Sequence, residues 1–220
     1  MSGRGGDRPS PGGQRPERQP PVVDVNRYGW VVGAIGVALV IAFSLSQLTG
    51  RGAASTGVAP GRPLRLFAAP LAGSGLNGVP NPSPSCDPAR HDPRALNLCL
   101  LVRRGPVALA FFVPQARRCV RQVDALQELS SRFPGVAFAA VAVGTGRAAA
   151  ARLVRSHRWT IPVAYDSDGE VGALYAVAAC PMVQLARRGG IVAARLIGDR
   201  WASAASLAPR VRALVGDARR

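Results

Sequence analysis

The chain has 220 residues and a formal net charge of +16, and all 28 of its basic residues are arginines. This length allows one ordinary domain with additional segments. A charge made up of arginines alone most simply reflects a GC-rich genome, and attraction to anionic lipid headgroups or envelope polymers is the functional alternative. Aromatic residues make up only 5% of the chain and do not alternate with basic ones, which argues against a nucleic-acid-binding protein.

The first segments differ sharply in composition from the rest. Residues 1–27 are rich in Gly, Pro, Arg and Gln, and we predict a disordered cytoplasmic tail there. Residues 28–50 contain no charged residue, and a helix of roughly 21 apolar residues covers the ~30 Å core of a bilayer. We therefore predict a transmembrane helix at 28–49 that contacts the lipid bilayer. A signal peptide cleaved near residues 52–54 is the alternative.

The cysteines indicate on which side of a membrane the rest of the chain would lie. Three arginines precede the apolar segment closely and three follow it, so charge alone gives only a weak orientation. All four cysteines follow the segment, and an even number on one side is typical of an oxidising compartment. We expect a single-pass protein of the cell membrane with its N-terminus in the cytoplasm and its main domain outside. The cysteines are Cys86, Cys99, Cys119 and Cys180.

A stretch poor in large side chains separates the apolar segment from the main domain. Residues 50–84 are rich in Gly, Ala, Ser and Pro and end in three closely spaced prolines. Such a composition predicts a semi-extended linker, although residues 64–67 could add a strand to a domain edge. The main domain is then expected at 85–218.

Within this domain, strand and helix patterns alternate. The continuous apolar runs at 107–113 and 136–143 predict two strands buried on both faces. Apolar residues at helical spacing follow the first run as far as Leu129, and residues 147–157 form a second helical pattern. This order is typical of parallel strands joined by crossover helices.

The last third of the domain follows a different pattern. A short strand at 162–165 ends in the turn 166–169, and the apolar stretches at 182–186 and 191–196 flank an Arg-Arg-Gly-Gly turn. We predict an antiparallel hairpin there and a closing helix over 207–214. The expected fold class is α/β, a mixed sheet of parallel units and a C-terminal hairpin, flanked by helices on both faces.

Two features mark a candidate site within this order of elements. Cys119 ends the sequence Ala-Arg-Arg-Cys at the first strand-to-helix junction, and Cys180-Pro181 directly precedes the hairpin. With these features the chain resembles the thioredoxin-like fold superfamily. The nearer resemblance is to membrane-anchored, extracytoplasmic thioredoxin or redoxin proteins of the thiol–disulfide interchange and peroxiredoxin-related group. It covers about residues 95–215 and implies that Cys119 is the second cysteine of a Cys-x-x-Cys pair facing a cis-proline, Pro181.

The chain departs from the family at three positions near Cys119. Ala116 replaces the first, nucleophilic cysteine, Gln115 replaces the usual aromatic residue, and Ala110 stands where many thioredoxins bury a carboxylate. An ordinary dithiol reductase therefore cannot be inferred. A peroxidase is less expected as well, because the stretch from Pro114 to Cys119 is shorter than in peroxiredoxins and lacks their threonine.

The resemblance supplies a partner for Cys119. In this fold the residue before the cis-proline packs against the redox turn, which implies a noncontiguous pair of catalytic cysteines, Cys119 and Cys180. The same resemblance implies that Pro181, Arg117 and Arg118 line the substrate groove.

The other two cysteines, Cys86 and Cys99, are close in sequence, and we expect them to form a structural disulfide. A zinc site is the rival use of four thiols, but no Cys-x-x-Cys spacing occurs and His91 is the only nearby imidazole. The glycines at 144 and 146 lack the rest of a nucleotide-binding motif. We predict no metal and no cofactor.

Two functions remain open at this stage. The first is a thiol–disulfide oxidoreductase of cell redox homeostasis that acts on protein thiols or disulfides of the cell envelope through Cys119 and Cys180. The second is a redox-inert, thioredoxin-like binding module whose disulfides are both structural. An exposed Cys119 sulfur within disulfide reach of Cys180 would favour the oxidoreductase, and a buried sulfur with no access path would favour the module.

Overall fold

The computed structural model describes residues 25–49 and 56–217 of the chain. Two compact units, Met1–Arg51 and Gly52–Arg220, make up the protein. The first contains the helix α1, Val25–Thr49. No helix in the described ranges combines the length and the apolar character that crossing a bilayer requires. The predicted tail at 1–27 lies outside the described residues except for its last three.

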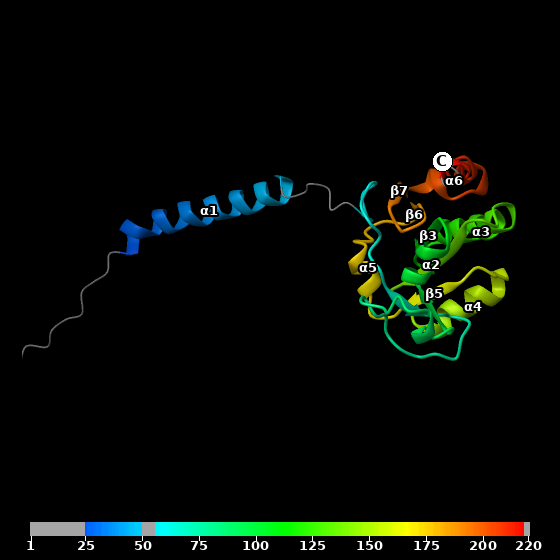
Figure 1. The fold of residues 1–220 in the computed structure, drawn as a ribbon. Helices are drawn as coiled ribbons and strands as arrows, with labels where there is room; N and C mark the ends of the chain where they lie inside the picture. The colour runs from blue at the N-terminus through cyan, green and yellow to red at the C-terminus, as the bar shows by residue number, and fades with distance from the viewer. Residues whose placement is uncertain (1–24, 50–55, 218–220) are drawn as a thin grey trace, which may run out of the picture. The chain divides into compact units, whose positions relative to one another are not determined.

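A five-stranded sheet with the order β5-β4-β3-β6-β7 forms the centre of the second unit (Figure 1). β3, Val107–Phe112, lies in the middle and pairs in parallel with β4, Ala137–Val143, which pairs in parallel with β5, Val163–Asp166. On the other side of β3 lies β6, Met182–Ala186, antiparallel to β3 and to β7, Val192–Ile197. The predicted mixed sheet with a C-terminal hairpin is confirmed.

The apolar run of β3 explains its central place in the sheet. All six of its residues are buried, and successive side chains point to opposite faces. One set packs into the core on one side of the sheet and the other set into the core on the opposite side. A strand with two apolar faces must be covered on both sides, which sets the layered architecture.

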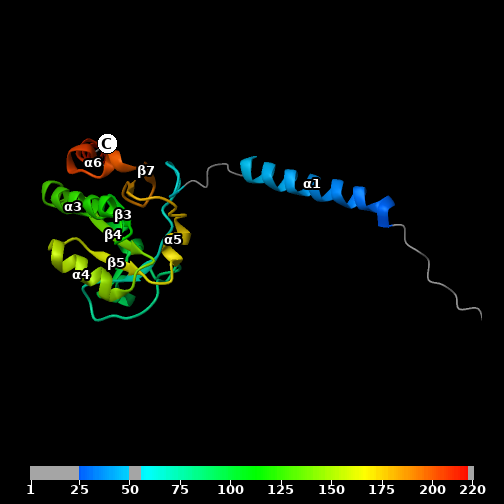
Figure 2. The ribbon, with the colours of Figure 1, turned by 180° about the vertical axis from the view of Figure 1, so that it is seen from behind.

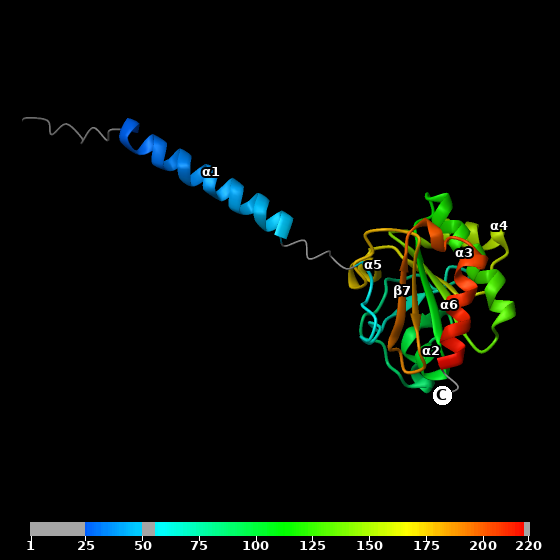
Figure 3. The same ribbon diagram turned by 90° about the horizontal axis from the view of Figure 1, so that it is seen from above.

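Helices cover the two faces unequally (Figures 2 and 3). α3, Arg117–Arg132, α4, Arg147–His157, and α6, Ala204–Asp217, pack on one face. The short helices α2, Leu98–Arg104, and α5, Glu170–Leu174, pack on the other face. The helices predicted after the first two strands and at the C-terminal end are confirmed, and both faces are covered as expected.

The predicted linker at 50–84 is wrong over its described part, residues 56–84. Leu64 and Phe67 are buried in the core beside α2 and α5, and the Leu64 N–H donates to the Gly190 carbonyl at 2.8 Å. β1, Ala68–Pro70, pairs antiparallel with β2, Ala95–Asn97. A few large apolar side chains among small residues and prolines are enough to fix this segment on the domain, which therefore begins well before residue 85.

Candidate functional site

A disulfide between Cys119 and Cys180 joins two segments at one end of the sheet. Cys119 is the third residue of α3, and Cys180 lies in the loop between α5 and β6. The two sulfurs are 1.98 Å apart and the two Cα atoms 5.6 Å apart. The peptide bond between Cys180 and Pro181 is cis. The pairing and the cis-proline expected from the sequence are both confirmed.

The sheet register explains why these segments meet. β3 ends at Phe112, and the turn that follows leads into α3 at Arg117. Phe111 of β3 is the register partner of Met182 in β6. Because Cys180 and Pro181 directly precede Met182, they lie beside the turn after β3 and against the start of α3.

The two cysteines of this disulfide differ in exposure. Cys119 is fully buried, with 0% of its surface exposed, and belongs to the core under α3, α4 and α6. Cys180 is half-buried and follows two exposed alanines, 178 and 179. Cys180 is therefore the more exposed residue of the pair.

The residues expected to form the substrate groove are placed unevenly. Arg117 and Arg118 are exposed in the first turn of α3, whereas Pro181 is buried behind Cys180. The first turn of α3 contains no acidic residue, and no side chain caps it. Arg118 lies 3.4 Å from Asp199, but both side chains are more than half exposed, so this pair is a weak surface contact. The cysteine pair thus lies at the positive end of a helix dipole with additional cationic side chains.

The core behind Cys119 holds no carboxylate at the position where many thioredoxins have one, because Ala110 is buried there. A polar residue that the sequence analysis missed, Gln122, lies one turn after Cys119 with 0% exposure. Its Nε2 donates to the Trp201 carbonyl at 3.1 Å, which ties α3 to the 3-10 turn Asp199–Trp201. The Gln122 Oε1 has no hydrogen-bond partner within the described residues. The apolar residues at helical spacing did not single out Gln122, and the sequence around it gives no sign of its partner.

The second disulfide joins Cys86 and Cys99, with their Cα atoms 5.4 Å apart, as expected. Cys99 is buried in the first turn of α2, and the Cys86 carbonyl accepts a hydrogen bond of 2.8 Å from Arg103. This bridge closes the loop that contains the 3-10 turn Pro88–Arg90. In the part of the chain that the structure describes, no group of three His, Cys, Asp or Glu residues could hold a metal ion.

Solved structures with the same arrangement of elements are numerous, although their sequences differ widely from this one. A protein assigned as the thiol:disulfide interchange protein DsbE from Chlorobium tepidum matches with a TM-score of 0.58 and 19% identity, over 72% of this chain and 99% of its own. A protein assigned as a disulfide isomerase from Bacteroides thetaiotaomicron matches with a TM-score of 0.58 and 15% identity, over 76% and 95%. The domain has a thioredoxin-like fold.

A further neighbour of this thioredoxin-like domain is the peroxidoxin BcpB from Mycobacterium tuberculosis, with a TM-score of 0.55 and 15% identity over 71% of this chain and 96% of its own. No protein-family model matches the sequence, and no curated protein sequence matches it. At these identities the similarity shows the fold, and the chemistry of the thioredoxin-like domain has to be argued from its own residues.

Proposed function

We propose that the protein is a thiol–disulfide oxidoreductase that exchanges the Cys119–Cys180 disulfide with protein thiols. One observation carries the proposal: the disulfide joins the first turn of α3 to the residue before a cis-proline, with one cysteine half-buried and the other fully buried. Such asymmetry allows an external thiolate to reach one sulfur while the other is kept from solvent.

The exchange proceeds in two steps. A substrate thiolate attacks the Cys180 sulfur, a mixed disulfide forms between substrate and Cys180, and the Cys119 sulfur leaves with the electron pair as a thiolate. A second substrate thiolate then attacks the substrate sulfur of the mixed disulfide. The substrate leaves oxidised, with its two sulfurs bonded, and both protein cysteines are reduced. The reverse sequence reduces a substrate disulfide.

The environment of Cys119 favours its role as the leaving group. A thiolate in the first turn of a helix interacts favourably with the backbone N–H groups and the helix dipole. Because the first turn of α3 lacks acidic residues and a side-chain cap, nothing in that turn competes for this position. Arg117, Arg118 and Arg121 are exposed around it and add positive charge.

We extend the proposal to the cellular setting. Residues 28–49 contain no charged residue and belong to α1, whose 25 residues would extend about 37 Å at 1.5 Å per residue. We propose that they anchor the protein in the cell membrane, with the cysteine-bearing domain outside and envelope proteins as partners. This part rests on the sequence, because no helix in the described ranges meets the requirements for a span.

The second candidate is a redox-inert binding module in which both disulfides are structural. The complete burial of Cys119 favours it, since a closed bridge between α3 and the loop before β6 would fix the shape of a binding surface. The two candidates differ in the reduction potential of the bridge.

Equilibration of the full-length protein in glutathione buffers of increasing reducing strength separates the candidates. Thiols are alkylated at each point, and peptide mass spectrometry scores each of the two disulfides separately. We expect the reduction potential of the Cys119–Cys180 bridge to lie above about −300 mV, in the range of exchanging disulfides. A value below that limit would identify a structural bridge and support the binding module. The Cys86–Cys99 bridge in the same samples is the internal control.

A further inference from the structure

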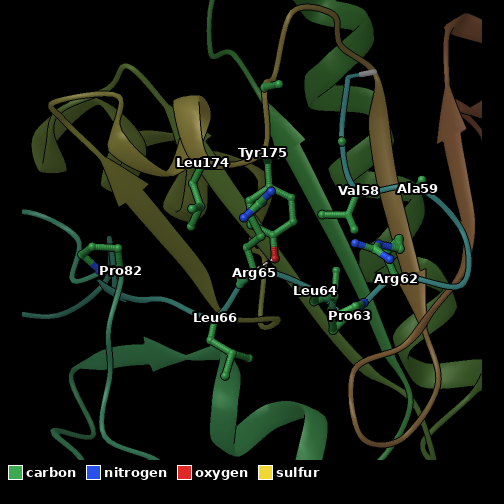
Figure 4. A pocket seen from close by; sticks show the side chains of 12 residues that line it. Val58, Ala59, Arg62, Pro63, Leu64, Arg65, Leu66, Pro82, Leu174 and Tyr175 are labelled. Atoms are coloured by element: carbon green, nitrogen blue, oxygen red, sulfur yellow. Dashed lines mark hydrogen bonds between the residues drawn. The ribbon is translucent and has the colours of Figure 1, made fainter. Parts of the chain in front are cut away.

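A cavity separate from the disulfide lies on the face of the sheet that carries α2 and α5. It has a volume of about 580 Å³, within the range of about 300–1,000 Å³ typical of small-molecule sites. Its walls come from three parts of the chain: residues 57–66, Pro82, and the end of α5 with the two residues that follow it. Figure 4 shows these side chains around the cavity.

The walls of the cavity combine polar and apolar surface, and the polar share is the larger. Leu64 and Tyr175 are buried at its base, and Val58, Leu66 and Leu174 are half-buried around it. The Tyr175 hydroxyl donates to the Arg65 carbonyl at 2.7 Å, so the phenol is already paired and presents its ring rather than its hydroxyl. A ligand with an apolar group could cover these apolar side chains, while its polar group meets the rest of the lining.

Two arginines supply the charged part of the cavity, Arg62 and Arg65. Both are exposed, and neither guanidinium forms an ion pair or a hydrogen bond within the described residues. None of the residues that line the cavity is acidic. Burial raises the pKa of the Tyr175 phenol, and the positive charge of Arg65 opposes that rise.

We propose that this cavity binds a small amphiphilic carboxylate, with the carboxylate at Arg62 and Arg65 and the apolar body against Leu66, Leu174 and Tyr175. A guanidinium matches the geometry of a carboxylate and forms two parallel hydrogen bonds with it. An alcohol of the same length leaves both guanidinium groups without a charged partner. An inorganic anion leaves the apolar side chains of the cavity uncovered. The site is independent of the proposed disulfide exchange.

Ala176 provides a sharp way to perturb the site. It lines the cavity, is exposed, and has a left-handed backbone with φ of 45°. Asn and Asp adopt this conformation more readily than other residues with a side chain. Ala176→Asp therefore adds a negative charge to the cavity without backbone strain, and Ala176→Asn is its neutral match.

The test uses the full-length protein in non-ionic detergent and a photoreactive decanoate, with the corresponding decanol derivative as the uncharged probe. Peptide mapping measures labelling of residues 57–66 and 174–176, and competition with unlabelled decanoate gives the half-saturating concentration. We expect saturable labelling of both segments by the decanoate, only weak labelling by the decanol, and no competition by inorganic phosphate.

The variants decide whether the arginines form the site. Arg62→Ala and Arg65→Ala should each raise the half-saturating concentration at least about tenfold, as expected for loss of a hydrogen bond to a charged group. Arg212→Ala, which removes the same charge from α6 on the other face of the sheet, should leave it unchanged. Ala176→Asp should weaken labelling and Ala176→Asn should not. The proposal would be overturned if the decanol probe labelled the two segments as strongly as the decanoate. It would also be overturned if Arg62→Ala and Arg65→Ala had no larger effect than Arg212→Ala, or Ala176→Asp no larger effect than Ala176→Asn.

Discussion

The two disulfides should stabilise the fold in the reverse of the order that their loop lengths suggest. Cys119 and Cys180 are 61 residues apart, whereas Cys86 and Cys99 are 13 apart. In the chain-entropy treatment, closing the longer loop stabilises the folded state by about 4 kcal/mol and closing the shorter loop by about 3 kcal/mol. A pair of structural bridges would follow this order.

Disulfide exchange requires a different outcome for the Cys119–Cys180 bridge. In the reduced protein, the helix N-terminus stabilises a Cys119 thiolate in the first turn of α3, and with it the folded state, by up to about 2 kcal/mol. The uncharged disulfide receives no such stabilisation. The net stabilisation by this bridge then falls from about 4 to about 2 kcal/mol. The Cys86–Cys99 bridge should keep its full value.

Two double variants isolate the bridges. Cys86→Ala with Cys99→Ala leaves only the Cys119–Cys180 bridge, and Cys119→Ala with Cys180→Ala leaves only the other one. Urea unfolding of each full-length variant at pH 7, with and without dithiothreitol, gives the free energy that its remaining disulfide contributes. We expect about 2 kcal/mol for the Cys119–Cys180 bridge and about 3 kcal/mol for the Cys86–Cys99 bridge. A contribution of about 4 kcal/mol from the Cys119–Cys180 bridge would refute the reasoning and leave the structural role.

Two further predictions concern the scaffold. Gly57→Ala should destabilise the domain by about 1–3 kcal/mol more than Gly61→Ala. Both glycines have a left-handed backbone, so the backbone strain is similar in the two variants, but only at Gly57 would an added Cβ collide with the Gln184 side chain. Equal losses in urea unfolding would mean that residue 57 does not pack on the domain. Burial raises the pKa of Asp166, although two backbone N–H groups donate to its carboxylate. The folded state then holds this proton more strongly than the unfolded state, so the contribution of Asp166 to stability falls as the pH rises above about 3.8. The loss of stability in Asp166→Asn should accordingly become smaller between pH 4 and pH 7, and a loss that grows with pH would contradict this assignment.

Much of the sheet could be predicted because its signals are local. The apolar runs of β3 and β4 are long and continuous, and a glycine-rich turn joins β6 and β7. The cysteine pairing needed one additional element, the antiparallel pairing of β3 with β6, which brings Cys180 to the start of α3. The resemblance to the thioredoxin-like fold supplied that element, since spacing in the sequence alone could not.

The parts that were missed depend on contacts between distant residues. The segment at 56–84 has the composition of a linker, but Leu64 and Phe67 are buried against α2 and α5. The five residues of α5 are too few to show helical periodicity. The hydrogen bond from Gln122 to the Trp201 carbonyl spans 79 residues and leaves no local signal. The cavity at Arg62 and Arg65 was missed for the same reason, because its walls come from segments that meet only in the folded chain.

The central claim is that substrate thiols attack Cys180 and that Cys119 is the leaving group. The single variants Cys119→Ser and Cys180→Ser test it most directly. Each full-length variant is incubated with oxidised glutathione under native conditions, and the mixed disulfide is located by peptide mass spectrometry. The account predicts that Cys119→Ser acquires glutathione at Cys180, whereas Cys180→Ser stays unmodified at the buried Cys119 until it is unfolded. Glutathione on native Cys180→Ser as fast as on Cys119→Ser, or on neither variant, would contradict it.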